Sequence, residues 1–232
     1  MKIAIMQPYF FPYIGYFQLI NASEKFVILD DVNFIKQGWI NRNKILVNGQ
    51  DNLITIPLKQ ASQNNSIKET FISDDNKWQS KLLKTIEFAY KHAPQFNNVF
   101  PIFEKSIQNS ERNISIFVPH SLLNLTQFLG IQTQIITSSS IYNNSHLKGQ
   151  ERIIDICKQE KADLYINPAG GIGLYSKEQF KKHKIDLRFL MPLPFEYKQF
   201  SNKFIPSLSI IDIMMFLEKR VILAELNNYH LG

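Results

Sequence analysis

Two short apolar segments near the amino terminus constrain the fold more than any other part of the sequence. Residues 3–6 and 26–29 each have the length and composition of a buried strand. Residues 13–20 lie between them and follow Pro12, and proline is favoured in the first turn of a helix. A strand, a helix and a second strand in this order are typical of parallel strands joined by a crossover. The sequence therefore predicts an α/β fold.

The middle of the chain predicts an antiparallel hairpin followed by helices. An Asn-Gly dipeptide at residues 48–49 separates two apolar segments, which is a strong hairpin signal. Three helix-like segments follow without a strand between them, at residues 77–91, 98–108 and 115–129. We expect residues from about 76 to 130 to form a helical insert or cap over the sheet.

The last part of the chain returns to alternating strands and helices. Strand-like segments separated by helix-like ones occur at residues 134–137, 163–166 and 185–190. An apolar helix is predicted from about Ile210, with Ser207 or Ser209 as its cap and Asp212 as a buried anchor rather than a wall of the site. No repeat or linker divides the chain. The predicted fold is therefore one α/β domain over residues 1–232, with a Rossmann-like, mainly parallel sheet, an antiparallel β-hairpin and a helical insert or cap.

Several classes of protein are disfavoured by composition. No apolar run approaches the ~20 residues of a membrane span, and the first apolar run is interrupted by polar and proline residues, unlike a signal peptide. We expect a cytoplasmic protein with no membrane span. The single cysteine, Cys157, is predicted to be a buried small hydrophobe, and the five histidines are scattered, so no structural zinc site is expected.

The net charge of +6 is spread along the chain rather than concentrated in a patch. A nucleic-acid-binding protein more often shows clustered basic residues in a recognisable reading module, so no nucleic-acid partner is expected. The charge is consistent with a mildly basic protein and equally with attraction to anionic substrates such as phosphates. The charge by itself does not separate these two interpretations.

Polar residues follow both amino-terminal strands. Gln7 follows the first strand, and Asp30 and Asp31 follow the second. In open α/β sheets, ligands bind outside the carboxyl ends of the strands. The two aspartates are therefore candidates for a base or metal site, although two carboxyl groups at a strand end also serve as simple caps.

The loop after the second strand is rich in groups that bind anions and sugars. Within eight residues it combines cations, amides and an indole, at Lys36, Trp39, Asn41, Arg42 and Asn43. Arginine suits bidentate recognition of phosphate or carboxylate, and tryptophan can stack on a base or a sugar. Lys59 lies just beyond the hairpin. A solvated loop anchored by one tryptophan is the alternative interpretation.

A glycine-rich segment follows the strand at residues 163–166. Gly170 and Gly171 can let a backbone approach a phosphate, with Asn167 and Tyr175 nearby. The segment is neither a P-loop nor a dinucleotide-binding motif, since the spacing of both is absent. A tight turn is the alternative. Residues 138–140, three serines, form another possible phosphate corner, for which a polar loop is the favoured interpretation.

Two long motifs resemble the WbqC-like protein family. They are MQPYFFPYIGYFQLI and FVILDDVNFIKQGWINRNKI, and the resemblance continues through YINPAGGIGLY and SLSIIDIMMF. Proteins of this family are often encoded in O-antigen and other surface-polysaccharide gene clusters, and glycine transfer to an amino sugar has been suggested as an activity. The resemblance implies a small-molecule substrate, a nucleotide-linked amino sugar being the expected one.

The turn after the first strand also resembles the His-x-Gly-His turn of nucleotidyl transferases and of pantothenate synthetase. Tyr13 and Tyr16 stand where that motif has histidines, and a tyrosine carries no positive charge near neutral pH. Cations from elsewhere would then have to stabilise phosphate. An ATP-dependent ligase that activates a carboxylate and passes it to a sugar amine reconciles both resemblances, with ATP and magnesium as the candidate cofactors.

The expected function is thus a transferase or ligase that N-acylates or aminoacylates an amino sugar. Asp30, Arg42 and Lys59 are the expected catalytic residues. The expected binding residues line the pocket and hold anionic groups: Gln7, Tyr9, Tyr13, Tyr16, Asp31, Lys36, Trp39, Asn41, Asn43, Asn167, Gly170, Gly171 and Tyr175. The rivals are a non-catalytic nucleotide-sugar binding protein and a nucleotidyl transferase, the latter disfavoured by the missing histidines.

Overall fold

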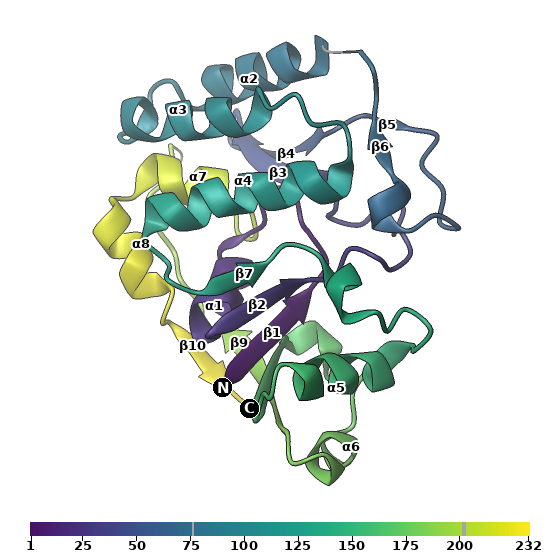
Figure 1. Cartoon of the computed structure of the whole chain (residues 1–232). Coiled ribbons are helices and arrows are strands. Elements are labelled where there is room, and N and C mark those ends of the chain that lie inside the picture. The colour runs from purple at the N-terminus through teal and green to yellow at the C-terminus, as the bar shows by residue number, and fades with distance from the viewer. Residues whose placement is uncertain (76, 201–202) are drawn as a thin grey trace.

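A six-stranded sheet forms the centre of the computed structural model, which describes residues 1–75, 77–200 and 203–232 (Figure 1). The strand order is β10-β9-β8-β1-β2-β7. Its strands are β1 (Lys2–Met6), β2 (Lys25–Ile28), β7 (Gln134–Ile136), β8 (Leu164–Pro168), β9 (Asp186–Pro192) and β10 (Tyr229–Leu231). All neighbours pair in parallel except β9 and β10, which are antiparallel. The predicted mainly parallel sheet is confirmed.

The order of the strands reverses at β1. The chain adds β2 and β7 on one side of β1 and β8 and β9 on the other. The register is direct, with Ala4 opposite both Phe26 and Ile166. Such a reversal leaves a crevice outside the carboxyl ends of the two strands that flank it. The fold itself therefore favours the β1–β8 boundary as a place for a ligand.

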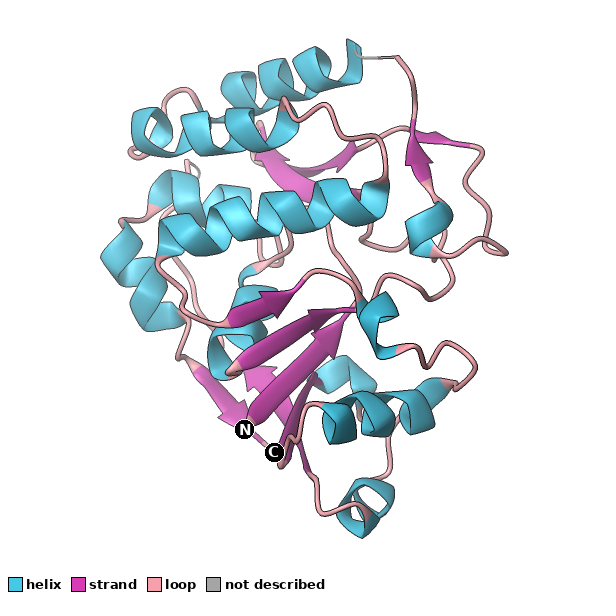
Figure 2. Cartoon of the chain, viewed as in Figure 1, coloured by secondary structure: helices cyan, strands magenta, loops and turns pink. Residues whose placement is uncertain are grey.

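Helices cover both faces of the sheet (Figure 2). One face packs against α1 (Ile14–Ala22) and the segment between β2 and β7, and the other packs against α5 (Gly149–Gln159) and α6 (Lys177–Lys182). Side chains alternate between the two faces along a strand. Accordingly, Ala4 belongs to the first core, and Ile3 and Ile5 belong to the second.

The segment between β2 and β7 contains the predicted hairpin and helices. The hairpin is β3 (Arg42–Val47) and β4 (Gln50–Thr55), and Asn48 and Gly49 at its turn both have positive φ, as a two-residue turn of this type requires. A smaller pair, β5 (Leu58–Lys59) and β6 (Phe71–Ile72), lies beside it, with the short helix η1 (Ile67–Glu69) between them.

Three helices complete this segment: α2 (Lys77–Tyr90), α3 (Phe96–Ile107) and α4 (Ile114–Leu129). The predicted helices are confirmed, with α3 starting two residues earlier than expected. The predicted start of the insert at Asn76 lies outside the described residues. α4 begins at Asn113, whose side chain accepts from the Ser115 N–H, and ends at Gly130 in the left-handed conformation.

The carboxyl-terminal tail wraps back onto the hairpin and the sheet. The single predicted helix is two helices, α7 (Ile210–Phe216) and α8 (Lys219–Glu225), followed by β10. Ser209 caps α7, and Asp212 is fully buried. Its carboxylate accepts from the hydroxyls of Tyr90 (2.8 Å) and Tyr197 (2.6 Å) and from the amide of Gln199 (2.8 Å). The anchor role predicted for Asp212 is confirmed, since it joins the tail to α2.

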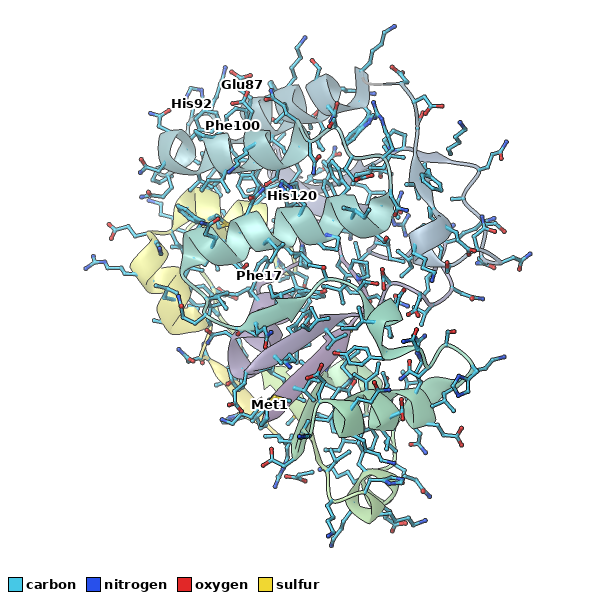
Figure 3. The ribbon with its side chains drawn as sticks, viewed as in Figure 1. Met1, Phe17, Glu87, His92, Phe100 and His120 are labelled. Carbon is cyan, nitrogen blue, oxygen red and sulfur yellow. The ribbon has the colours of Figure 1, made fainter. Side chains whose placement is uncertain are left out.

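None of the helices in the described part of the chain is both long and apolar enough to cross a membrane. The larger core takes side chains from the sheet, the inserted helices and the tail, among them Phe17, Phe117 and Met214 (Figure 3 labels Phe17). A core shared in this way favours joint unfolding. We propose that residues 1–232 behave as one domain.

Joint unfolding can be tested directly, because both tryptophans, Trp39 and Trp78, lie between β2 and β7. Tryptophan fluorescence therefore reports on the inserted segment, whereas far-UV circular dichroism reports on every helix and strand. We expect the two thermal transitions to coincide, as two-state unfolding requires. Transitions separated by several degrees would mean that the insert unfolds independently.

Candidate functional site

Polar side chains gather at the carboxyl edge of the sheet. The arrowheads of β1 and β2 end beside the short helix η2 (Ser139–Tyr142), which follows β7 (Figure 1). Gln7 continues β1, and Asp30 lies two residues after β2, whose end is held by the Leu29 N–H bonding to the Met6 carbonyl (2.8 Å). The edge thus brings together residues from three separate parts of the chain.

Asp30 is buried and held by two serines. Its Oδ1 accepts hydrogen bonds from the Ser138 hydroxyl (2.9 Å) and from the Ser139 N–H (3.0 Å). The Ser139 hydroxyl lies 3.2 Å from the same oxygen. Burial raises the pKa of this carboxyl, and the serine hydrogen bonds offset only part of that rise. No described residue hydrogen bonds to the other oxygen, Oδ2. The side chain is only 3% exposed, and Oδ2 is the oxygen that has no hydrogen bond to lose on accepting a proton.

Asp31 has a different environment, because it forms a buried ion pair. The Arg152 guanidinium lies 2.5 Å from Asp31 Oδ1, and both side chains are almost fully buried. Arg152 is oriented in turn by Asn144, whose oxygen lies 3.0 Å from Arg152 Nε. Burial alone would raise the pKa of Asp31, but hydrogen bonds from Ser139 and Arg152 and the arginine charge lower it overall. Asp31 is thus an ionised support beside Asp30.

An aromatic pocket opens beside the loop after β1. It has a volume of about 290 Å³ and is lined by Tyr9, Pro12, Tyr13, Trp39, Asn43 and Ser207. Tyr13 is 39% exposed and Trp39 is 40% exposed, so both rings are accessible to a ligand. Pockets with aromatic walls and few polar groups are typical of small-molecule sites. Four of the lining residues are among those predicted from the sequence.

Asn43 supports this pocket through hydrogen bonds to the backbone of the loop after β1. Its side-chain amide donates to the carbonyls of Phe10 (3.0 Å) and Phe11 (2.9 Å), and the Phe11 carbonyl also accepts from the Ser209 hydroxyl (2.6 Å). Phe11 has a positive φ of 41°, which is unfavourable for a phenylalanine. The hydrogen bonds from Asn43 and Ser209 hold the loop in that conformation.

The two tyrosines of the β1–α1 turn have different environments. Tyr13 precedes α1 with an extended backbone, and its ring lies over Gly15, where any Cβ would collide with it. Tyr16 lies inside the helix, is buried against Tyr9 and Phe26, and donates its hydroxyl to the Gln7 carbonyl (2.8 Å). Tyr13 therefore lines the pocket, whereas Tyr16 supports it from the core.

The glycine-rich segment follows β8 at the same edge. Asn167 is buried and donates to the Tyr165 hydroxyl (2.6 Å), and a Cβ on Gly171 would collide with the Asn167 side chain. This close approach explains why residue 171 is a glycine. Gly170 has open space around it, and Tyr175 packs edge-on against Tyr165. The segment is thus a compact turn, part of which, η3 (Ala169–Gly171), is a short helix.

A model of the WbqC-like protein family matches residues 7–222 of the chain. The chain belongs to that family. It is also 28% identical over 220 residues to "Uncharacterized protein Rv1507c" of Mycobacterium tuberculosis (strain ATCC 25618 / H37Rv), an alignment that covers 92% of each chain. No solved structure matches the chain. The family match confirms the resemblance carried by the sequence motifs, and it begins at Gln7, the first polar residue of the sheet edge.

The predicted cations of this WbqC-like chain do not meet in the aromatic pocket. Arg42 donates to loop carbonyls, from Nε to Gly38 (3.0 Å) and from its second nitrogen to Gln37. Lys59 pairs with Asp74 (2.9 Å) and lines a separate hollow with Arg112 and Glu69. Asn41 donates to the Ile56 carbonyl (2.9 Å), and Lys36 is exposed. Arg42 and Asn41 therefore shape the loop that carries Trp39.

Arg152 was not predicted from the sequence to belong to the site, although it pairs with Asp31. It shares the buried face of α5 with Ile153, Ile156 and Cys157. An arginine at a position where the helix period places an apolar residue is the signal that could have revealed it. Its partner could not be read from the sequence, because Asp31 is 121 residues away along the chain. Within the described residues, no group of three or more His, Cys, Asp or Glu side chains is placed to hold a metal ion.

Proposed function

We propose that the protein is an amide-forming transferase or ligase that acts on the amine of a nucleotide-linked amino sugar in surface-polysaccharide synthesis. The observation that carries the proposal is Asp30, a buried carboxylate with a raised pKa and one oxygen without a hydrogen-bond partner among the described residues, at the same sheet edge as an accessible aromatic pocket. Membership of the WbqC-like family agrees with a role in this chemistry.

The aromatic pocket supplies the binding half of the proposed function. The Tyr13 and Trp39 side chains are partly exposed, and aromatic rings stack on nucleobases and on the apolar faces of sugar rings. The net charge of +6 favours the approach of a nucleotide diphosphate. We propose that the pocket takes the base or the sugar of the substrate.

Asp30 supplies the chemical half. In the proposed reaction, ATP and a carboxylic acid such as glycine form an acyl-adenylate and release pyrophosphate. The sugar amine then attacks the acyl carbon, the amide bond forms, AMP leaves, and Asp30 Oδ2 takes the proton lost by the nitrogen. The serines that bind Oδ1 orient the carboxylate for this transfer.

The positions of the predicted cations favour a second candidate function. Arg42 binds loop carbonyls and Lys59 pairs with Asp74, so neither is committed to a phosphate in the pocket. A nucleotide-sugar binding protein has no adenylation step, so it needs no cation to stabilise charge that develops on a reacting phosphate. The two functions differ in turnover rather than in binding.

The test combines ligand binding with product formation. Purified protein is mixed with ATP, magnesium, amino acids and UDP- or dTDP-linked amino sugars, and pyrophosphate and AMP are measured. We expect pyrophosphate release only when ATP and a suitable amino acid are both present, and an amide product when the sugar is added. A sugar nucleotide that raises the melting temperature without any release over the whole panel would support the binding protein instead.

A further inference from the structure

A second surface, which shares no lining residue with the aromatic pocket, lies between β4 and α2. Two adjoining hollows of about 560 and 480 Å³ share Lys81 and Thr85. The smaller one is walled by residues of β4 on one side and by Trp78 and Leu82 of α2 on the other. The larger continues along α2 to Phe88. Together they form a groove, called the β4–α2 groove below.

The backbone of β4 is free along this side of the hairpin. On β3, the Leu46 N–H donates to the Tyr90 hydroxyl (2.8 Å), and the Lys44 carbonyl accepts from the Ser209 N–H (2.8 Å), so both groups point away from β4. In an antiparallel ladder, the residues opposite such positions also point outward. These are Asp51 and Leu53, and no other described residue hydrogen bonds to their backbone N–H and C=O groups. The Asp51 N–H interacts with the carboxylate of its own side chain.

The groove has apolar floor and rim side chains together with positive charge. Leu53 is 47% exposed and Phe88 is 62% exposed. The indole nitrogen of Trp78 is buried and has no hydrogen-bond acceptor among the described residues, which is unfavourable for a buried donor. Lys81 is common to both hollows. A partner that offers carbonyl and apolar groups would complement this surface.

The charges define the partner further. The lining lysines are Lys77, Lys81 and Lys84, and none has an ion pair with a described residue. No acidic residue lines either hollow, and Glu87, the acidic residue of α2 (labelled in Figure 3), is not among the lining residues. The one charged residue of β4 is Asp51, and its carboxylate is paired with Lys44 of β3 (2.6 Å), so the lysines of α2 supply the uncompensated charge of the groove. The observations therefore favour an acidic partner.

We propose that the β4–α2 groove binds an extended, acidic segment of a partner protein as an added strand on β4. Main-chain hydrogen bonds to Asp51 and Leu53 supply the pairing. Alternate apolar side chains enter the groove over Trp78 and Leu82, and acidic side chains meet the lysines of α2. Strand addition to a free sheet edge is a recurring mode of peptide recognition. The site is independent of the function proposed above.

The test uses two capped, fluorescein-labelled peptides, one alternating glutamate with valine and one alternating lysine with valine. We expect the acidic peptide to raise fluorescence anisotropy with micromolar affinity that weakens in salt, and the basic peptide to bind at least ten times more weakly. In hydrogen exchange, the amides of Asp51 and Leu53 should slow on adding the acidic peptide, which is the signature of an added strand.

A charge-reversed variant, Lys81→Glu with Lys84→Glu, should lose at least tenfold in affinity. Lys91→Glu is the matched control, since it makes the same kind of change just beyond α2 and outside both hollows. Absence of binding to the wild type, equal loss in the control, or unchanged exchange at Leu53 would each overturn the proposal. A concentration-dependent dimer that protects Leu53 without peptide would overturn it in favour of pairing between two copies.

Discussion

Asp30→Asn is expected to lower the turnover of the proposed amide-forming reaction by about 10²–10⁴-fold, the usual contribution of a positioned base. Asparagine keeps the shape of the side chain and an oxygen that can accept from Ser138 and Ser139. Its amide nitrogen cannot take a proton. The measurement is kcat for amide formation, beside a thermal-shift titration with the sugar nucleotide, which should be little changed.

The pH dependence of the same reaction tests whether Asp30 acts as the base. A base works in its ionised form, and burial raises the pKa of Asp30, so the rate should fall on acidification at a higher pH than for an ordinary aspartate. Ser138→Ala removes a hydrogen bond that lowers this pKa. The acidic limb of the profile should therefore move to still higher pH in that variant. A limb that stays in place, or full activity in Asp30→Asn, would remove Asp30 from the role of base.

Asp212→Ala is expected to lower the free energy of unfolding by about 3–5 kcal/mol. The change leaves the hydroxyls of Tyr90 and Tyr197 and the amide of Gln199 without their acceptor, and each unpaired buried donor costs on the order of 1–3 kcal/mol. For a chain of this length, the melting temperature should fall by about 6–20 °C. Circular dichroism and urea titration measure both quantities.

Asp212→Asn is the matched control, because it keeps an acceptor and removes the buried charge. Burial raises the pKa of Asp212, so the stability from its protonation is complete below about pH 3.9 and is lost as the pH rises through the folded pKa. The wild type therefore bears the cost of a buried carboxylate at neutral pH, and the asparagine variant should lose less than the alanine variant. Equal, small losses in both would show that Asp212 does not join the tail to α2.

The parallel strands of the sheet could be predicted from the sequence because each has a local apolar pattern. The apolar runs at β1, β2 and β8 end in polar residues, and the Asn-Gly turn identifies the β3–β4 hairpin. Because the carboxyl ends of parallel strands share one edge, Gln7, Asp30 and Asn167 could be assigned to it without coordinates. Those inferences use only spacing and strand direction.

The orientation of individual side chains could not be predicted in this way. Tyr13 and Tyr16 lie three residues apart, which on one continuous helix would place them on the same face. The helix starts at Ile14 and Tyr13 is extended, so the two rings separate. Helix boundaries are uncertain by a residue or two from sequence, and here that difference decides which tyrosine lines the aromatic pocket.

Long-range pairing accounts for the rest. Arg152 is committed to Asp31, and Lys59 to Asp74, by contacts between segments whose separation carries no local signal. The second half of the tail shows the same limit, since α8 and β10 depend on docking against α4 and β9. The residue types suited to an anion site were recognisable, but their partners decide which of them remain available.

During synthesis on the ribosome, one of the two strands that pair with β1 is made much later than the other. β2 emerges soon after it, whereas β8 follows only after the whole inserted segment, β7 and α5. Through that interval one edge of β1 has no strand to pair with, and apolar edges of this kind promote association between nascent chains. We expect chains truncated before Leu164 to aggregate, and the yield of full-length protein to rise when translation is slowed enough for the insert to fold first.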